Sequence, residues 1–310
     1  MENRKLAICF LLFSTLLSLF PHFAAAEPSK NISAVFAFGD STLDAGNNND
    51  LSTLVRADHP PYGRDFPGQV PTGRFTNGKL ITDFLVSSLG LRDVLPSHSD
   101  RSLAMANLTT GVSFASGGSG LDDLTATTSG VTTVGRQVAN FAAYIERLEA
   151  AVGNDEASRI IKDAMFVIGA GSNDMMMNYY ILPARRMTFS TVSSYQRFLL
   201  SQLQKLVMVF LFPPLLAAAF FVFFWKYNAA IIQHGSKKIR NSRPSTGFTE
   251  TNLGCCGTGS MEMGPLCNPL VPTCPFPNRF MFWDSVHPSQ ATYQALAKQF
   301  METVMPEFRK

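Results

Sequence analysis

The chain has 310 residues, enough for one large domain or two small ones. Hydrophobic residues make up 46% of it and charged residues 16%, which excludes a disordered, collagen-like or coiled-coil protein. The formal net charge of +3 arises from 26 basic and 23 acidic residues, and so weak a bias does not predict binding to nucleic acid.

The N-terminal segment has the pattern of a secretory signal peptide. Arg4 and Lys5 precede an apolar run from Leu6 to Phe20, and residues 24–26 are three alanines that a signal peptidase accepts. An uncleaved membrane anchor is the alternative, but the run is shorter than the roughly 20 residues that span a bilayer. We therefore expect residues 1–26 to be removed, and residues 27–310 to form a single secreted, extracellular domain.

Secretion would bring the chain into an oxidising compartment. Asn31 and Asn107 each begin an Asn-x-Ser/Thr tripeptide, so we expect N-glycosylation at both. Four cysteines of the mature chain lie within 20 positions of one another: Cys255, Cys256, Cys267 and Cys274. They could form two disulfides or bind zinc, and the adjacent pair together with the absence of a nearby histidine favours disulfides.

The predicted elements alternate between strands and helices. Short apolar runs at 34–38, 111–115 and 164–168 predict buried strands, each followed by a glycine-rich polar turn. Apolar residues at helical spacing predict helices over 80–89 and 138–152, and Pro288 predicts the start of a last helix that runs to about residue 305. This order predicts an α/β layered fold with a mainly parallel sheet, whose strand-end turns meet in one crevice.

Three side chains from the two ends of the chain can form a nucleophilic site. A serine nucleophile needs a base to take its proton, and the base needs a partner that fixes its tautomer. Ser41 follows the first strand, and Asp284 lies three residues before His287, close enough for a tight turn to join them. We expect Ser41 to be the nucleophile, His287 the base and Asp284 its partner.

Such a site also needs donors for the oxyanion of the tetrahedral intermediate. The backbone N–H of Ser41 can serve if a helical turn follows it. Gly117 can present its N–H because a residue without Cβ lets substrate approach, and Asn173 can offer its side-chain amide. We expect Ser41, Gly117 and Asn173 to form the oxyanion hole.

Five spaced blocks resemble, in order, those of the plant GDSL esterase/lipases, within the SGNH hydrolase superfamily. They lie at residues 38–49, 73–79, 113–120, 171–174 and 283–288, and the resemblance covers about 33–205 and 248–310. It implies a three-layer flavodoxin-like fold and hydrolysis of ester bonds in lipids or other acyl esters. It also implies the same triad and oxyanion residues, and a need for no metal or organic cofactor.

The segment from about 206 to 247 departs from the family pattern. The family would place here a strand, a glycine- and cysteine-containing turn, a long helix and a further strand, and the chain is shorter than a typical member. Val207–Leu211 followed by Pro213-Pro214 resembles only the first strand and turn. Three interpretations are open: a transmembrane helix over Val207–Trp225, which Pro213-Pro214 would break, a buried strand plus helix, or an altered gene model.

The sequence thus predicts a secreted serine esterase or lipase that acts on an acyl-ester substrate. Two alternatives stay open at this stage. One is a catalytically impaired or non-catalytic protein that keeps the fold and binds an acyl or glycan ligand. The other is a variant with membrane contact through Val207–Trp225. The pattern does not predict an oligomeric state.

Overall fold

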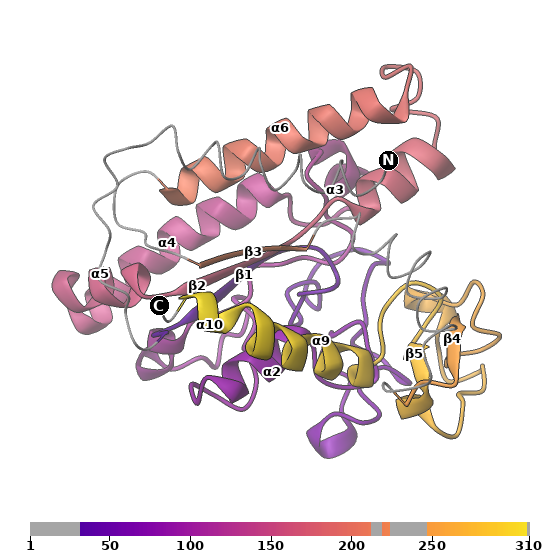
Figure 1. The fold of residues 1–310 in the computed structure, drawn as a ribbon, viewed down its shortest axis with the longest axis horizontal. Helices are drawn as coiled ribbons and strands as arrows, with labels where there is room; N and C mark the ends of the chain where they lie inside the picture. The colour runs from indigo at the N-terminus through magenta and orange to yellow at the C-terminus, as the bar shows by residue number, and fades with distance from the viewer. Residues whose placement is uncertain (1–31, 212–218, 224–246, 309–310) are drawn as a thin grey trace.

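A computed structural model describes residues 32–211, 219–223 and 247–308 (Figure 1). The segment expected to be a signal peptide and the glycosylation candidate Asn31 lie outside these residues. Two sheets are present in the described ranges. Strands β1 (Val35–Gly39), β2 (Met165–Gly169) and β3 (Ala219–Phe223) form a parallel sheet in the order β1-β2-β3, and β4 (Glu250–Gly254) pairs in parallel with β5 (Phe280–Phe282).

The helices are α2 (Ile81–Ser88), α3 (Asp123–Ser129), α4 (Val134–Val152), α5 (Asn154–Lys162), α6 (Val192–Leu211), α9 (Gln290–Thr303) and α10 (Met305–Phe308). In sequence, the helices lie in two stretches, α2 to α6 before β3 and α9 and α10 after β5. A π-helix, η3 (Asp174–Ile181), begins after a short turn at the end of β2. None of the helices in the described ranges is long and apolar enough to cross a bilayer.

Helices lie against both faces of the parallel sheet, so the fold is α/β (Figure 1). Phe36 and Phe38 of β1 join Phe166 of β2 in a core cluster with residues of α4, α5 and α6. The intervening residues Val35 and Ala37 join a second cluster with residues of α2 and α9. Every residue of β1 and β2 is buried, as expected for parallel strands covered on two sides.

Strand β1 ends in a turn that requires glycine. Gly39 has a φ of 127°, and a Cβ at this position would lie 1.8 Å from the carbonyl oxygen of Gly169. The N–H of Asp40 donates to the same carbonyl at 2.8 Å. The turn therefore leaves β1 in close contact with β2 and places Ser41 at the carboxyl end of the sheet.

Residues 111–115 run beside β1, as the sequence predicts, but they form isolated bridges. Ser113 is bridged in parallel to Ala37 on one side and to Ser97 on the other. The side-chain amide of Asn47 donates to the carbonyls of Ser113 and Ala115, at 2.8 Å each. The segment is nonetheless hydrogen-bonded to β1, because the N–H groups of Phe114 and Ser116 donate to the carbonyls of Ala37 and Gly39, at 2.7 and 2.9 Å.

The predicted helices are present, with shifted starts. The helix expected over 138–152 is α4, which begins earlier at Val134 because the hydroxyl of Thr133 accepts a hydrogen bond from the N–H of Arg136. The helix expected to start at Pro288 begins at Gln290 instead. Ser289 is its N-cap, and its hydroxyl accepts from the N–H of Thr292 at 3.3 Å.

The atypical segment is a helix end and a strand wherever the structure describes it. Val207–Leu211, which resembled a strand in sequence, is the last part of α6. The helical spacing of the buried residues Tyr195, Leu199, Leu203 and Leu206 against the first core cluster explains this difference. Ala219–Phe223 provides the strand beside β2 instead. Residues 212–218 and 224–246 lie outside the described residues, but the strand at Ala219–Phe223 contradicts a single transmembrane helix over Val207–Trp225.

Candidate active site

The turn after β1 holds Ser41 in a fixed position. Both the N–H and the hydroxyl of Thr42 donate to Oδ1 of Asp40, at 3.0 and 2.7 Å, and the N–H of Leu43 donates to the Asp40 carbonyl. Burial raises the pKa of Asp40 above its ordinary value. These local hydrogen bonds fix the backbone of the turn on both sides of the nucleophile candidate.

The Asp284–His287 loop folds back on itself as the sequence predicts. Oδ1 of Asp284 accepts from the backbone N–H groups of Val286 and His287, at 2.9 and 2.7 Å. Oδ2 of Asp284 lies 2.7 Å from Nδ1 of His287. The carboxylate is thus held by its own loop and faces the imidazole ring.

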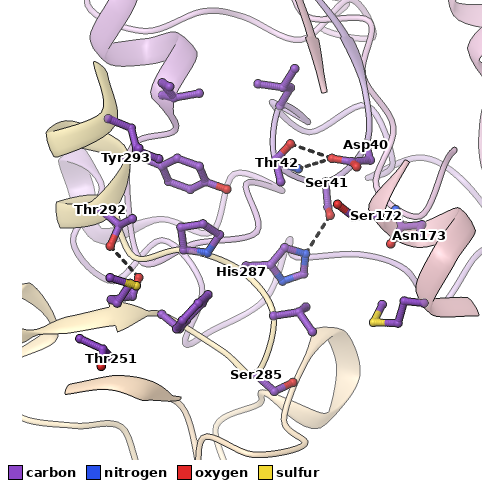
Figure 2. Close-up of a pocket in the computed structure, with 18 of the residues that line it drawn as sticks. Asp40, Ser41, Thr42, Ser172, Asn173, Thr251, Ser285, His287, Thr292 and Tyr293 are labelled. Atoms are coloured by element: carbon purple, nitrogen blue, oxygen red, sulfur yellow. Dashed lines mark hydrogen bonds between the residues drawn. The ribbon is translucent and has the colours of Figure 1, made fainter. Parts of the chain in front are cut away.

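Ser41, His287 and Asp284 lie in hydrogen-bonding sequence. Oγ of Ser41 lies 2.8 Å from Nε2 of His287, across 246 positions of the chain (Figure 2). Asp284 is fully buried and His287 is 8% exposed, so the contacts are shielded from water. A proton on Nδ1, shared with Asp284, leaves Nε2 as the acceptor for the serine proton.

The block at 73–79 holds the histidine loop in place. The ring of Phe75 packs against that of His287 with centroids 5.0 Å apart. The hydroxyl of Thr76 donates to the carbonyl of Pro288, and Oδ1 of Asn77 accepts from the N–H of Gln290, at 2.9 and 2.8 Å. The function of this block in the structure is therefore to position the C-terminal half of the site.

A buried ion pair anchors the same block. Arg74 reaches both oxygens of Asp83 at 2.8 and 2.9 Å, and it also donates to the carbonyls of Ala45 and Leu95. Asp83 in turn accepts from the N–H groups of Leu80 and Leu95. Both charges are therefore fully hydrogen-bonded, which a buried pair requires for stability.

Asn173 lies beside Ser41, as expected for an oxyanion-hole residue (Figure 2). Nδ2 of Asn173 donates to the carbonyl of Ser119 at 2.9 Å, which orients the amide. Because an amide nitrogen carries two donors, the second remains for a ligand. Asp174 next to it is a buried structural acceptor for the N–H groups of Leu121 and Asp122, and burial raises its pKa to about 6.

Gly117 differs from the expectation. Its N–H donates to Oδ2 of Asp44 at 2.8 Å, and a Cβ on Gly117 would lie 2.5 Å from the ring of Phe75. Asp44 is fully buried, and burial raises its pKa to about 6. Gly117 thus connects its loop to the turn of the nucleophile in this geometry, while its N–H is not directed to an oxyanion.

A cavity of about 250 Å³ opens beside Ser41 and His287. One part of its wall is apolar and comes mainly from the β1 turn, α2, β5 and α9: Leu43, Ile81, Met281, Tyr293 and Leu296. The other part carries polar side chains: Ser172, Asn173, Thr251, Asn252 and Ser285. Among the described residues, none between 177 and 250 lines the cavity, so the described parts of the atypical segment contribute nothing to it.

Comparisons with known proteins identify the family of the chain. The family model for GDSL-like lipase/acylhydrolase matches residues 35–300. The chain belongs to the GDSL lipase/acylhydrolase family. It is 36% identical to the GDSL esterase/lipase At2g40250 of Arabidopsis thaliana over 360 aligned positions, which cover 98% of each chain. A second Arabidopsis thaliana protein, the GDSL esterase/lipase At1g06990, is 36% identical over 320 positions, which cover 87% of this chain and 89% of the relative.

Membership of the GDSL family makes this chain a carboxylic ester hydrolase, and it confirms the resemblance found in the sequence. The alignment with the first relative has more positions than this chain has residues, so that relative contains residues that this chain lacks. The described cavity wall does not include the segment in which the sequence departs from the GDSL pattern.

The sequence interpretation missed Tyr62. Its hydroxyl donates to Oδ2 of Asp284 at 2.6 Å, across 222 positions of the chain. Tyr62 lies in the Pro60–Gly63 loop, which carries no recognised chemical pattern. A bulky aromatic residue inside a segment rich in proline, glycine and polar residues was the available signal, since aromatic side chains bury a large apolar area when they pack.

The cysteine and glycosylation predictions have different outcomes. The four cysteines form the disulfides Cys255–Cys274 and Cys256–Cys267, which confirms the prediction of disulfides. No group of three or more histidine, cysteine or acidic side chains in the described part of the chain is arranged to hold a metal ion. Asn107 is exposed, so its side chain is accessible, while its glycosylation stays a prediction.

Proposed function

We propose that this GDSL hydrolase is a secreted serine esterase that cleaves carboxylic esters of lipids or other acyl groups with the triad Ser41, His287 and Asp284. The observation that carries the proposal is the hydrogen-bonded sequence Ser41 Oγ–His287 Nε2–Asp284, with distances of 2.8 and 2.7 Å. The proposal includes the three-layer flavodoxin-like fold of the SGNH hydrolase superfamily, in which helices cover both faces of a parallel sheet.

The reaction begins when Oγ of Ser41 attacks the ester carbonyl while Nε2 of His287 takes its proton. Asp284 stabilises the imidazolium that forms. The backbone N–H of Ser41 and the side-chain amide of Asn173 stabilise the oxyanion. The tetrahedral intermediate then collapses, and the alcohol leaves with the proton from His287. Water attacks the acyl-enzyme with His287 again as the base, which releases the acid and restores Ser41.

The cavity supports an acyl ester as the substrate. The apolar wall between α2 and α9 fits the acyl part, because burying apolar surface there is favourable. The polar side chains on the other part of the wall offer hydrogen bonds to the alcohol part. Secretion and glycosylation at Asn31 and Asn107 remain part of this proposal, and the two disulfides support it because such bonds persist in oxidising compartments.

Labelling with a fluorophosphonate tests the proposal. We expect the probe to modify the wild-type chain at Ser41 and to leave Ser41→Ala unlabelled. Ser33→Ala is the control, because the Ser33 hydroxyl bonds the carbonyl of Ile160 away from the cavity, and this variant keeps its labelling. A folded wild-type chain that neither labels nor hydrolyses p-nitrophenyl acetate or butyrate contradicts the proposal.

A further inference from the structure

We infer that Tyr62 is a positioning residue of the triad, which fixes Oδ2 of Asp284 and reduces the negative charge that this oxygen presents to His287. The inference rests on the proposed function, because it concerns the same site. Oδ2 of Asp284 has two partners: Nδ1 of His287 at 2.7 Å and the hydroxyl of Tyr62 at 2.6 Å. The phenol and the imidazole therefore share one carboxylate oxygen.

The direction of the Tyr62 hydrogen bond follows from its second partner. The N–H of Gly264 donates to the Tyr62 oxygen at 2.8 Å, so the phenol proton is left for Asp284. Burial, and after it the charge of Asp284, raises the pKa of Tyr62 well above its ordinary value. The phenol is thus a permanent donor to the carboxylate over the pH range in which an esterase works.

Packing fixes the position of the Tyr62 ring. It is 1% exposed, and it lies edge-on to Phe75 and Trp283, with centroids 6.1 and 6.4 Å away. The same cluster contains the disulfide-bonded Cys256 and Cys267, and Gly264 begins the short 3-10 helix that leads to Cys267. Tyr62 therefore connects the disulfide-bonded loop to the acid of the triad.

The effect of the shared oxygen on His287 has a definite sign. Oδ1 of Asp284 already accepts two backbone N–H groups, so Oδ2 is the oxygen that stabilises a protonated ring. A second donor on Oδ2 weakens that stabilisation, because each donor spreads the charge of the carboxylate. Tyr62 thereby limits how strongly Asp284 can stabilise the imidazolium that forms when His287 takes the serine proton.

Other ionisable groups face His287, but the change that we propose does not alter them. Asp40 on the β1 turn interacts electrostatically with His287, and Tyr293 on α9 interacts with Asp40 and Asp284. The guanidinium of Arg64 lies over the Trp283 ring, 6.0 Å from its centroid. Removal of the Tyr62 hydroxyl leaves these groups in place, so a shift in pH dependence reports the lost hydrogen bond.

The test is Tyr62→Phe, with kcat/KM measured against pH on a p-nitrophenyl ester. We expect the acid limb of the profile to move to higher pH by roughly half to one unit, with KM little changed. Tyr195→Phe is the matched control, because the Tyr195 hydroxyl donates to the buried Asp122 at 3.0 Å outside the cavity. This control loses a similar hydrogen bond and keeps the wild-type profile.

An unshifted acid limb in a folded Tyr62→Phe chain overturns the inference. If that variant does not fold, proton NMR of the wild-type chain decides the question. The Tyr62 hydroxyl proton, assigned through its contact to the Gly264 amide, must exchange slowly with water, and its chemical shift must change with pH across the acid limb of the activity profile. A resonance that fails either condition overturns the inference. A wild-type chain without esterase activity but with this coupling would contradict the proposed function and leave the role of Tyr62 intact.

Discussion

Asp284→Asn should abolish most of the activity while leaving the loop in place. The four groups that approach the Asp284 carboxylate all do so as donors or potential donors: the N–H groups of Val286 and His287, the Tyr62 hydroxyl and Nδ1 of His287. An asparagine must put its NH₂ group at one of the two oxygen positions. At the Oδ1 position it would meet two backbone N–H groups, so the Oδ2 position is favoured.

An NH₂ group at that position reverses the role of the histidine. Nδ1 of His287 would accept a hydrogen bond from the amide, so the ring proton would reside on Nε2, which faces Ser41 at 2.8 Å. Nε2 could then no longer take the serine proton. Wrong-tautomer substitutions of this kind lower kcat by about 10⁴, which corresponds to about 5.5 kcal/mol of transition-state stabilisation.

The assay is the steady-state hydrolysis of p-nitrophenyl butyrate, with thermal unfolding measured on the same samples. Asp122→Asn is the matched control, because Asp122 is also buried and accepts hydrogen bonds from Arg185 and Tyr195 away from the triad. We expect its folded fraction to keep kcat within a few-fold of wild type. Activity of folded Asp284→Asn within tenfold of wild type would refute the assignment of Asp284.

Two further predictions concern stability. Arg74→Ala leaves the buried Asp83 carboxylate without its ion-pair partner, and urea unfolding should show a loss of about 3–5 kcal/mol; a loss under 1 kcal/mol would contradict the role of the pair. Burial raises the pKa of Asp174 to about 6, so the folded chain takes up a proton between about pH 4 and pH 6 that the unfolded chain does not. The resulting stability is present at pH 4 and is lost as the pH rises through 6, so the unfolding free energy of wild type relative to Asp174→Asn should fall by roughly 3 kcal/mol between pH 4 and pH 7. A difference that is independent of pH would contradict the raised pKa.

The three triad positions could be predicted because their signals are local. Asp284 and His287 lie three residues apart, and Ser41 follows a short apolar strand, so each pattern fits in a few residues. Their convergence follows from the general position of sites at the carboxyl ends of parallel strands. Tyr62 could not be found in this way, because its contact with Asp284 depends on how a long loop packs against the C-terminal region.

The assignment of Gly117 shows a second limit of the sequence. A glycine in a turn after a strand predicts that another group approaches its backbone closely. The structure confirms this, because the ring of Phe75 lies where a Cβ on Gly117 would be. The sequence does not say which group approaches or which acceptor takes the N–H. Asp44 was a distant residue with no recognised role, and its burial beside Gly117 is a result of tertiary packing.

The same limit explains the differences in the secondary structure. α3, α5 and α6 were not predicted, because α3 and α5 are short and α6 enters the segment where the family pattern ends. The apolar run at 207–211 fits a strand or a helix by composition, and packing of the preceding turns decides for the helix. Short apolar runs next to glycine-rich turns were predicted correctly as strands at 34–38 and 164–168.

The separation of 246 positions between the nucleophile and its base has a consequence for biosynthesis. A ribosome has made the strands β1 and β2 long before it reaches codon 284, yet a product terminated before that point has no base for Ser41. Ester cleavage therefore becomes possible only after roughly the last tenth of the chain has been synthesised and has packed against β1, so esterase activity can serve as a reporter of full-length chains in an expression screen.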